Sequence, residues 1–182
     1  MDRQYLYDAP WGLLLRAMTL FSICLLCGMV AVGLTNRPSG SFGWDLVMII
    51  LPLVMLVVAV FFTIRGYLLF PDVLFVQRLG WYSKIPLDGL LAASFDPEAT
   101  KRMTRRFGNG GMFCFAGFFK SKKIGPFRAF ATDLRRAVVL QFADRTIVVT
   151  PGDPLDFVEK ITTVRGLANA GAGEDGGSSA KR

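Results

Sequence analysis

The sequence predicts a membrane-anchored α+β protein, in which a two-helix transmembrane hairpin is followed by a strand-rich domain that ends in a helix. Three observations predict this class. Two long apolar runs lie near the N-terminus, short segments of alternating apolar and polar residues follow them, and one amphipathic segment precedes a tail rich in glycine and serine. The 182 residues are 52% hydrophobic and only 19% charged, a composition that is untypical of a disordered chain.

The two apolar runs cover residues 17–34 and 46–64, and neither contains a charged residue. At about 1.5 Å per residue each run spans roughly 27–29 Å, close to the thickness of a hydrocarbon core. Pro52 lies inside the second run, where a membrane helix tolerates it as a kink. We therefore predict two membrane-spanning helices, joined by an external loop at residues 35–45. The aromatic residues that flank the runs are expected in the interfacial belt, namely Trp11, Trp44 and Tyr67.

Two alternative interpretations remain open for the runs. Both could form a buried helical hairpin in a soluble core, and the first could be a cleaved signal peptide. Arg3 and Arg16 would then form the basic region of the signal, with residues 31–33 as its cleavage site. The second run follows within a dozen residues, which favours a retained hairpin.

Basic residues close to the runs predict the orientation of the hairpin. The connecting loop contains only Arg37, whereas more basic residues lie on the other side of the runs, namely Arg3, Arg16, Arg65, Arg78 and Lys84. Positive residues concentrate on the cytoplasmic side of membrane proteins. We therefore expect a multi-pass protein of the bacterial inner membrane with both termini in the cytoplasm.

Beyond residue 64 the sequence predicts a domain of strands at residues 65–165. The expected strands are 73–78, 81–84, 90–95, 112–119, 126–132, 137–142 and 146–150, because these segments alternate and are rich in β-branched and aromatic residues. Asp153 followed by Pro154 predicts a helix N-terminus, and the helix is expected to extend to Arg165. Residues 1–16 precede the hairpin as a cytoplasmic segment, and residues 166–182 are expected to form a disordered tail.

Six or seven antiparallel strands closed by one α-helix resemble the β-barrel of a pleckstrin-homology (PH) domain. The chain is similar to bacterial PH-domain membrane proteins over about residues 67–164. The similarity rests on the segments LFPDVLFVQRLGWYSKIPLDGL, RRFGNGGMFCFAGFF and VVLQFADRTIVVTPGDPLDFVEKI. It implies a cytoplasmic PH-like β-barrel that is capped by the C-terminal helix.

Two groups of basic residues flank the expected strand at residues 112–119. The candidate contacts are Lys101, Arg102, Arg105 and Arg106 before the strand and Lys120, Lys122 and Lys123 after it. Under a cytoplasmic leaflet, such side chains contribute about 1 kcal/mol each to the binding of anionic lipids. A partner protein and a merely solvated charged surface are the other interpretations. The two groups lie at opposite ends of the strand, or a curled loop brings them together.

Gly108, Gly110 and Gly111 surround Asn109 in a glycine-rich segment. Loops that bind phosphate aim the N-terminus of a helix at the anion, but the segment that follows here is typical of a strand. We therefore expect a structural glycine loop that feeds a strand and binds no nucleotide.

Nothing in the sequence indicates catalysis. The chain has no histidine, which excludes histidine-based catalysis and histidine-ligated metals. Cys24 and Cys27 share a helix face and are expected to pack between helices with Gly28 and Ala31, whereas Cys114 is expected in the core. The carboxylates form no recognisable acid/base pair. We expect no catalytic residue, no metal and no cofactor.

The sequence therefore predicts a non-enzymatic inner-membrane protein that presents a cytoplasmic PH-like module for interaction or scaffolding. Its partner would be another protein or a second copy of the chain. The net charge of +7 is explained by the side of the membrane on which the domain lies, so no nucleic acid is expected. A peripheral reader of anionic lipid headgroups and a small subunit of an oligomeric channel or transporter are the alternative functions.

Overall fold

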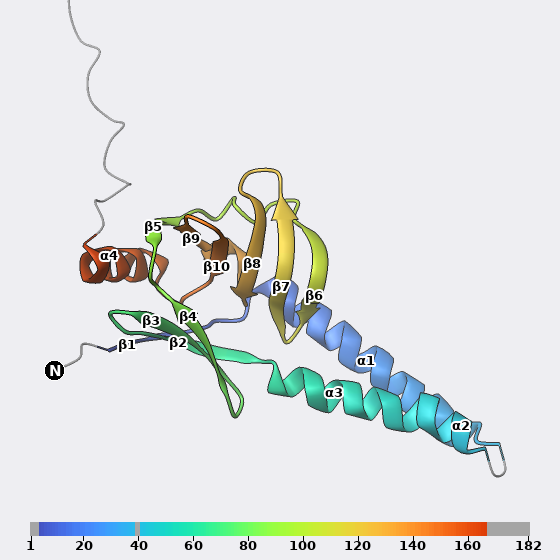
Figure 1. Cartoon of the computed structure of the whole chain (residues 1–182). Coiled ribbons are helices and arrows are strands. Elements are labelled where there is room, and N and C mark those ends of the chain that lie inside the picture. The colour runs from blue at the N-terminus through green and yellow to red at the C-terminus, as the bar shows by residue number, and fades with distance from the viewer. Residues whose placement is uncertain (1–3, 39–40, 167–182) are drawn as a thin grey trace, which may run out of the picture.

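The computed structural model describes residues 4–38 and 41–166 (Figure 1). The strands are β1 (Tyr5–Asp8), β2 (Ile64–Leu69), β3 (Val73–Arg78), β4 (Tyr82–Pro86), β5 (Leu90–Phe95), β6 (Thr104–Met112), β7 (Cys114–Ser121), β8 (Gly125–Ala131), β9 (Val138–Phe142) and β10 (Thr146–Val149). The helical elements are α1 (Leu13–Thr35), α2 (Phe42–Asp45), the π-helical turn η1 (Leu46–Ile50), α3 (Leu51–Phe61), the 3₁₀ turn η2 (Leu134–Arg136) and α4 (Pro154–Arg165). The predicted tail lies outside the described residues from residue 167 onward.

The strands form two sheets. One has four antiparallel strands in the order β1-β2-β3-β4, and the other has six in the order β5-β9-β10-β8-β7-β6. Strands β8 and β10 are parallel. Strand β8 therefore lies between β7 and β10 and does not pair with β9, which follows it in the sequence. Within the described residues no strand pairing joins the two sheets. The domain thus differs from the expected barrel of six or seven antiparallel strands, although its β-rich body and terminal helix agree with it.

Strand β2 follows α3 almost directly, and its first residue, Ile64, is the last residue of the second apolar run. It pairs with β1, so the N-terminal segment completes the four-stranded sheet. Tyr67 faces inward from β2 and is fully buried, because alternate residues of a strand point to opposite faces. The prediction that Tyr67 lies in the membrane interface is therefore wrong. Its hydroxyl donates to the carbonyl of Phe130 at 2.6 Å and accepts from the backbone N–H of Thr150 at 3.2 Å.

The main hydrophobic core lies between the two sheets and α4. Its largest fully buried members include Tyr67, Leu74, Leu140 and Phe157. A second core covers the opposite face of the six-stranded sheet and includes Phe119, Phe127 and Val148 together with Leu15 from α1. The beginning of α1 is thus part of the folded domain.

The helices project from the domain as a pair and lie side by side along their length (Figure 1). Segments 13–35 and 42–61 are long and apolar enough to cross a membrane, and only 17% and 11% of their most apolar windows are buried. Within one copy of the chain they are therefore not the buried hairpin of a soluble core. At the far end the indole Nε1 of Trp44 donates to the carbonyl of Gly33 at 3.0 Å and ties the helices together.

The contact between the helices depends on a glycine other than the expected one. A Cβ atom at Gly33 would lie 2.8 Å from the Cβ of Met48, so the close approach requires glycine there. Cys24, Cys27 and Gly28 are exposed, and a Cβ at Gly28 would meet nothing within 4 Å. These small residues do not pack against α3, because they lie on the outer face of α1. Pro52 follows the π-helical turn directly, where the widened turn accommodates its missing N–H.

Candidate functional site at the helix–domain junction

The first half of the junction holds α1 against the domain. Leu15 is completely buried in the second core, and the backbone N–H of Gly12 donates to the carbonyl of Thr132 at 3.2 Å. One turn later, Thr19 Oγ1 accepts from the backbone N–H of Phe113 at 3.0 Å. Phe113 forms the tip of the β6–β7 hairpin, so this tip is fastened to α1.

The second half of the junction holds the C-terminal end of α3. The last carbonyls of a helix lack intrahelical partners, and here side chains of the domain supply them. The Nη1 of Arg78 donates to the carbonyl of Phe62 at 2.8 Å, and the indole Nε1 of Trp81 donates to that of Phe61 at 3.1 Å. The β3–β4 hairpin therefore fixes α3 as the β6–β7 hairpin fixes α1.

Arg78 is a buried cation without a carboxylate partner among the described residues. It is only 5% exposed, and its Nε donates to the hydroxyl of Ser83 at 3.2 Å. Desolvation by burial lowers the pKa of Arg78 from its usual value. The partial negative charge at the C-terminal end of α3 and the face of the Trp81 ring, 4.7 Å from the guanidinium carbon, stabilise its positive charge.

Cys114 lies next to Arg78 and behaves as a core residue. Its Sγ donates to the carbonyl of Phe62 at 3.2 Å, and burial raises the pKa of the thiol to about 11. The thiol is therefore protonated at neutral pH, which makes it a poor nucleophile.

A cavity of about 610 Å³ opens beside these capping contacts, and we call it the junction cavity. Its apolar wall on α3 is formed by Val54, Met55, Val58 and Ala59. The β3–β4 hairpin and strands β6, β7 and β8 form the other walls. Among the described residues that line it, only Arg78 and Arg128 carry a charge. The junction cavity is thus apolar on its helical side and positively charged where it meets the sheets.

Arg128 extends from β8 on the same side as Phe130. Its guanidinium carbon lies 4.8 Å from the centre of the Phe130 ring and 5.7 Å from that of Phe118. It is exposed and forms no ion pair with any described carboxylate. The guanidinium carbon of Arg78 lies 5.7 Å from the same Phe130 ring, so the two cations are near neighbours.

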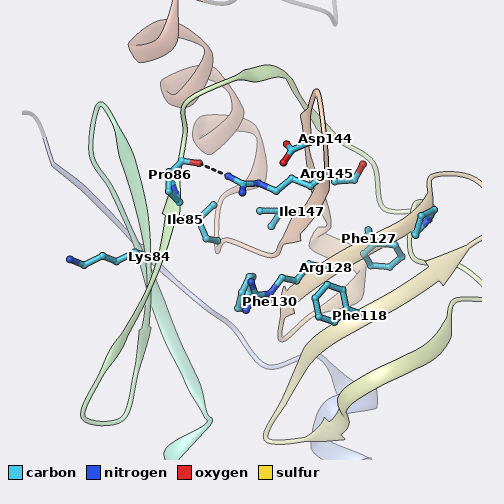
Figure 2. A pocket seen from close by; sticks show the side chains of 12 residues that line it. Lys84, Ile85, Pro86, Phe118, Phe127, Arg128, Phe130, Asp144, Arg145 and Ile147 are labelled. Carbon is cyan, nitrogen blue, oxygen red and sulfur yellow. Dashed lines mark hydrogen bonds between the residues drawn. The ribbon is translucent and has the colours of Figure 1, made fainter.

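Arg128 also borders a second cavity, of about 310 Å³, in the gap between the two sheets. Figure 2 shows Arg128 beside Phe118 and Phe130 and shows Lys84 pointing away from this cavity. Arg145 is held by a bond from its Nη2 to the carbonyl of Pro86 at 3.3 Å. The inter-sheet cavity is the smaller of the two, its Lys84 points away and its Arg145 is bonded to Pro86, so the junction cavity is the stronger candidate for a binding site.

The predicted basic residues converge, but they lie elsewhere. Thr104 pairs with Lys120 in the β6–β7 hairpin, which brings both basic groups to the same end of the hairpin. Two of the lysines are in ion pairs, Lys101 with Glu98 and Lys123 with Asp96. The opposite end of the hairpin contacts α1, and at about 3.3 Å per residue β6 is roughly 25 Å long. None of the seven basic residues lines the junction cavity.

The predicted glycine loop is wrong, because Gly108, Gly110 and Gly111 lie in strand β6. Gly108 pairs with Gly117, and a Cβ atom at Gly108 would lie 2.4 Å from the carbonyl oxygen of Ala116. Glycine allows the two strands to approach this closely. The φ of Gly108, +109°, is also unfavourable for residues that have a side chain. A strand therefore forms where the sequence pattern indicated a loop.

Sequence reasoning missed Arg78 and Arg128 as site residues. A signal was present for Arg78, because it follows Leu74 and Val76 at a spacing of two and so belongs to the inward face of β3. No comparable signal links Arg128 to α3, since their proximity depends on the pairing of distant strands.

Residues 65–164 match the family described as bacterial PH domain, which covers more than half of the chain. Searches of curated proteins and of solved structures found no match.

Proposed function

The chain belongs to the bacterial PH domain family, and from this premise we propose that it is a non-enzymatic protein of the bacterial inner membrane. Its two apolar helices cross the bilayer, with both termini in the cytoplasm. The PH domain is held at the cytoplasmic face as an interaction module, and its partner is another membrane protein or a second copy of the chain.

The observation that carries this proposal is the way in which both helices are attached to the domain at the junction. Most exposed side chains of both helices are apolar, with Arg16 exposed in the first turn of α1, and the domain-proximal ends of the helices are fixed by buried contacts. Leu15 is embedded in the second core, and Arg78 and Trp81 cap α3. A rigid attachment of this kind supports a domain that is held in one orientation at the membrane surface, as an anchored module requires.

The same contacts argue against cleavage of the first run as a signal peptide. Cleavage at residues 31–33 would remove β1, which forms an outer strand of the four-stranded sheet, together with Leu15. The backbone N–H of Gly152 also donates to the carbonyl of Asp8 at 2.8 Å. The segment before the cleavage site is thus needed by the folded domain, which supports a retained helix.

An open strand edge supports an interaction role. Strand β6 lies at the edge of the six-stranded sheet, and residues 104–108 are exposed along it. Phe107, with 76% of its surface exposed, is an unusually accessible aromatic residue for a domain surface. An exposed edge can pair with a strand of a partner, which gives affinity through backbone hydrogen bonds.

The proposal is tested on the full chain, extracted from membranes in mild detergent and weighed by native mass spectrometry. We expect the protein to resist alkaline carbonate extraction and to form a self-oligomer or a complex of defined stoichiometry. Phe107→Ser should dissociate that complex. The matched control is Leu91→Ser, because Leu91 is 62% exposed on β5 at the opposite edge of the same sheet. A carbonate-soluble protein, or a monomer without any partner, would contradict the proposal.

The two alternative functions receive less support. Most of the seven basic residues lie towards the end of the hairpin that is remote from α1, which disfavours their direct contact with lipid headgroups, whereas the Arg105 side chain runs along β6 and donates to the carbonyl of Gly108. The apolar runs contain no ionisable residue of the kind that marks a transport pathway.

A further inference from the structure

The junction cavity changes in polarity along its length. Its helical wall includes Val54 and Val58, which belong to the apolar segment 42–61. Its opposite side is bordered by the guanidinium groups of Arg78 and Arg128. If α3 crosses the bilayer, as proposed above, the apolar wall faces the acyl-chain region and the cations lie near the level of the headgroups.

The two cations leave a surplus of positive charge in a site whose other lining residues are uncharged. Arg78 donates to two neutral acceptors, the carbonyl of Phe62 and the hydroxyl of Ser83, and neither arginine forms an ion pair with a described carboxylate. Both guanidinium groups lie near the ring of Phe130. A negatively charged group at this place would be attracted by both cations and could form charge-assisted hydrogen bonds with Arg128.

We infer that the junction cavity binds one anionic phospholipid, with its phosphate at Arg128 and an acyl chain along the α3 wall. The two positive charges favour a negatively charged ligand, and the apolar wall favours one that carries a hydrocarbon chain. A soluble phosphate would leave that wall in contact with water. The volume of about 610 Å³ fits part of one lipid, its headgroup and the upper part of a chain. The inference rests on the proposed membrane anchoring and adds a ligand to it.

The test is a native mass spectrum of the full-length protein released from nanodiscs that contain equal amounts of phosphatidylglycerol and phosphatidylethanolamine. We expect one phosphatidylglycerol to remain bound per chain in preference to phosphatidylethanolamine. Arg128→Gln should lower the retained phosphatidylglycerol about tenfold, the loss expected when a charge-assisted hydrogen bond is removed. Arg128 is exposed, so this variant should fold. Arg106→Gln removes the same charge from β6 outside the cavity and should retain the lipid.

A second pair of variants tests the apolar wall without changing any charge. Val58→Trp fills the cavity and should displace the lipid. Val57→Trp is the matched control, because Val57 is 56% exposed on α3, against 49% for Val58, but does not line the cavity. Glycerol 1-phosphate at millimolar concentration should fail to displace the lipid, since it has no chain to contact the wall.

The outcomes separate this inference from the function on which it rests. Lipid retention that is unchanged in both Arg128→Gln and Val58→Trp would show non-specific lipid around the helices and would overturn the inference. Equal losses in Arg128→Gln and Arg106→Gln would overturn it as well, because they would indicate only overall charge. If Val58→Trp releases a polypeptide and leaves the lipid in place, the occupant is a protein segment. In each of these cases the protein still partitions into membranes, whereas a carbonate-soluble protein would contradict the anchoring itself.

Discussion

At the residue scale, two buried polar side chains organise the molecule. Arg78 lies among apolar residues and joins the domain to the end of α3 without a carboxylate. Tyr67 joins the two sheets, because its hydroxyl from β2 reaches the backbone of β8 and of Thr150. Both residues lie on the inward face of a strand. Arg78 follows Leu74 and Val76 at a spacing of two, and Tyr67 alternates with Leu69. Strand periodicity can predict their inward direction, but their partners come from distant parts of the chain.

The change Tyr67→Phe tests the bridge between the sheets. It removes the buried hydroxyl that bonds the backbone N–H of Thr150 and the carbonyl of Phe130, so both groups lose this hydrogen-bond partner. Unsatisfied buried groups of this kind cost about 1–3 kcal/mol. We expect the free energy of unfolding to fall by this amount in denaturant titrations of the detergent-solubilised protein. Tyr82→Phe is the control, because Tyr82 is 53% exposed, and an equal effect of both changes would contradict the bridging role.

The ionisation of Tyr67 gives a pH dependence of stability. Burial raises the pKa of Tyr67 to about 12, from an ordinary value of 10.0. The folded protein therefore holds the phenolic proton more tightly than the unfolded chain does. The resulting stability is complete below pH 10 and is lost as the pH rises towards 12, by about 2 kcal/mol. The stability advantage of the wild type over Tyr67→Phe should shrink across this range, and a constant difference would contradict the shifted pKa.

At the scale of elements, the β6–β7 hairpin shows how glycine changes the structure that a sequence pattern indicates. The glycine-rich segment contains residues that favour loops, yet its backbone pairs along most of β7. The tip of the hairpin fastens α1, and its middle forms one wall of the junction cavity. The hairpin thus contributes both to the attachment of α1 and to the wall of the junction cavity.

Gly117→Ala tests the close approach of the two strands. A Cβ atom at Gly117 would lie 2.2 Å from the carbonyl oxygen of Phe107, and the φ of +147° adds strain. Because backbone atoms cannot move aside as a flexible side chain can, we expect a loss of about 2 kcal/mol or more in the free energy of unfolding. Gly28→Ala, on the open face of α1, should cause no loss, since helix propensity favours alanine. Equal stability of Gly117→Ala and the wild type would exclude this packing.

Leu15→Ala tests whether the first turns of α1 belong to the domain. Leu15 is completely buried, whereas its neighbour Leu14 is 56% exposed. Removing a buried leucine side chain costs about 2–5 kcal/mol. The change at Leu15 should lower the Tm of the β-rich domain, followed by circular dichroism of its strands, and Leu14→Ala should leave it unaltered. If both changes have the same effect, α1 is not anchored in the domain core.

The sequence predicts some of these elements closely. Strands β3 and β5 and helix α4 have the expected bounds, because each combines a regular apolar pattern with clear turn or capping residues. Strand β1 is only four residues long and is stabilised by pairing with β2 across the whole helical hairpin. Strand β2 continues an apolar run, and β6 contains the glycines that suggested a loop. Local patterns do not reveal strands whose stability comes from distant partners.

At the scale of the whole molecule, the candidate site depends on topology more than on any motif. The junction cavity combines residues from α3, the β3–β4 hairpin and three neighbouring strands of the other sheet. Composition drew attention to clusters of arginine and lysine, and none of the residues that it selected lines the junction cavity. The two charged residues that line the junction cavity are Arg78, on the inward face of β3, and Arg128, on β8. Their isolation from carboxylates in space is a property of the fold.

The whole-molecule account also explains how a small domain is oriented. Each helix has its own attachment to the domain, α1 through Leu15 and Thr19 and α3 through Arg78 and Trp81. If the helices cross the bilayer with both termini in the cytoplasm, as proposed, these attachments place the junction cavity at the cytoplasmic interface. The basic end of the β6–β7 hairpin and α4 would then face the cytoplasm.

Site-directed labelling of single cysteines in intact spheroplasts tests the membrane-anchored arrangement most directly. In a chain whose three native cysteines are replaced, a membrane-impermeant maleimide should label Ser41→Cys, in the loop between the helices, without permeabilisation. It should label Lys122→Cys, in the exposed turn between β7 and β8, only after the membrane is opened. Labelling of Lys122→Cys in intact spheroplasts, or protection of both positions, would contradict the anchored, cytoplasmic PH domain.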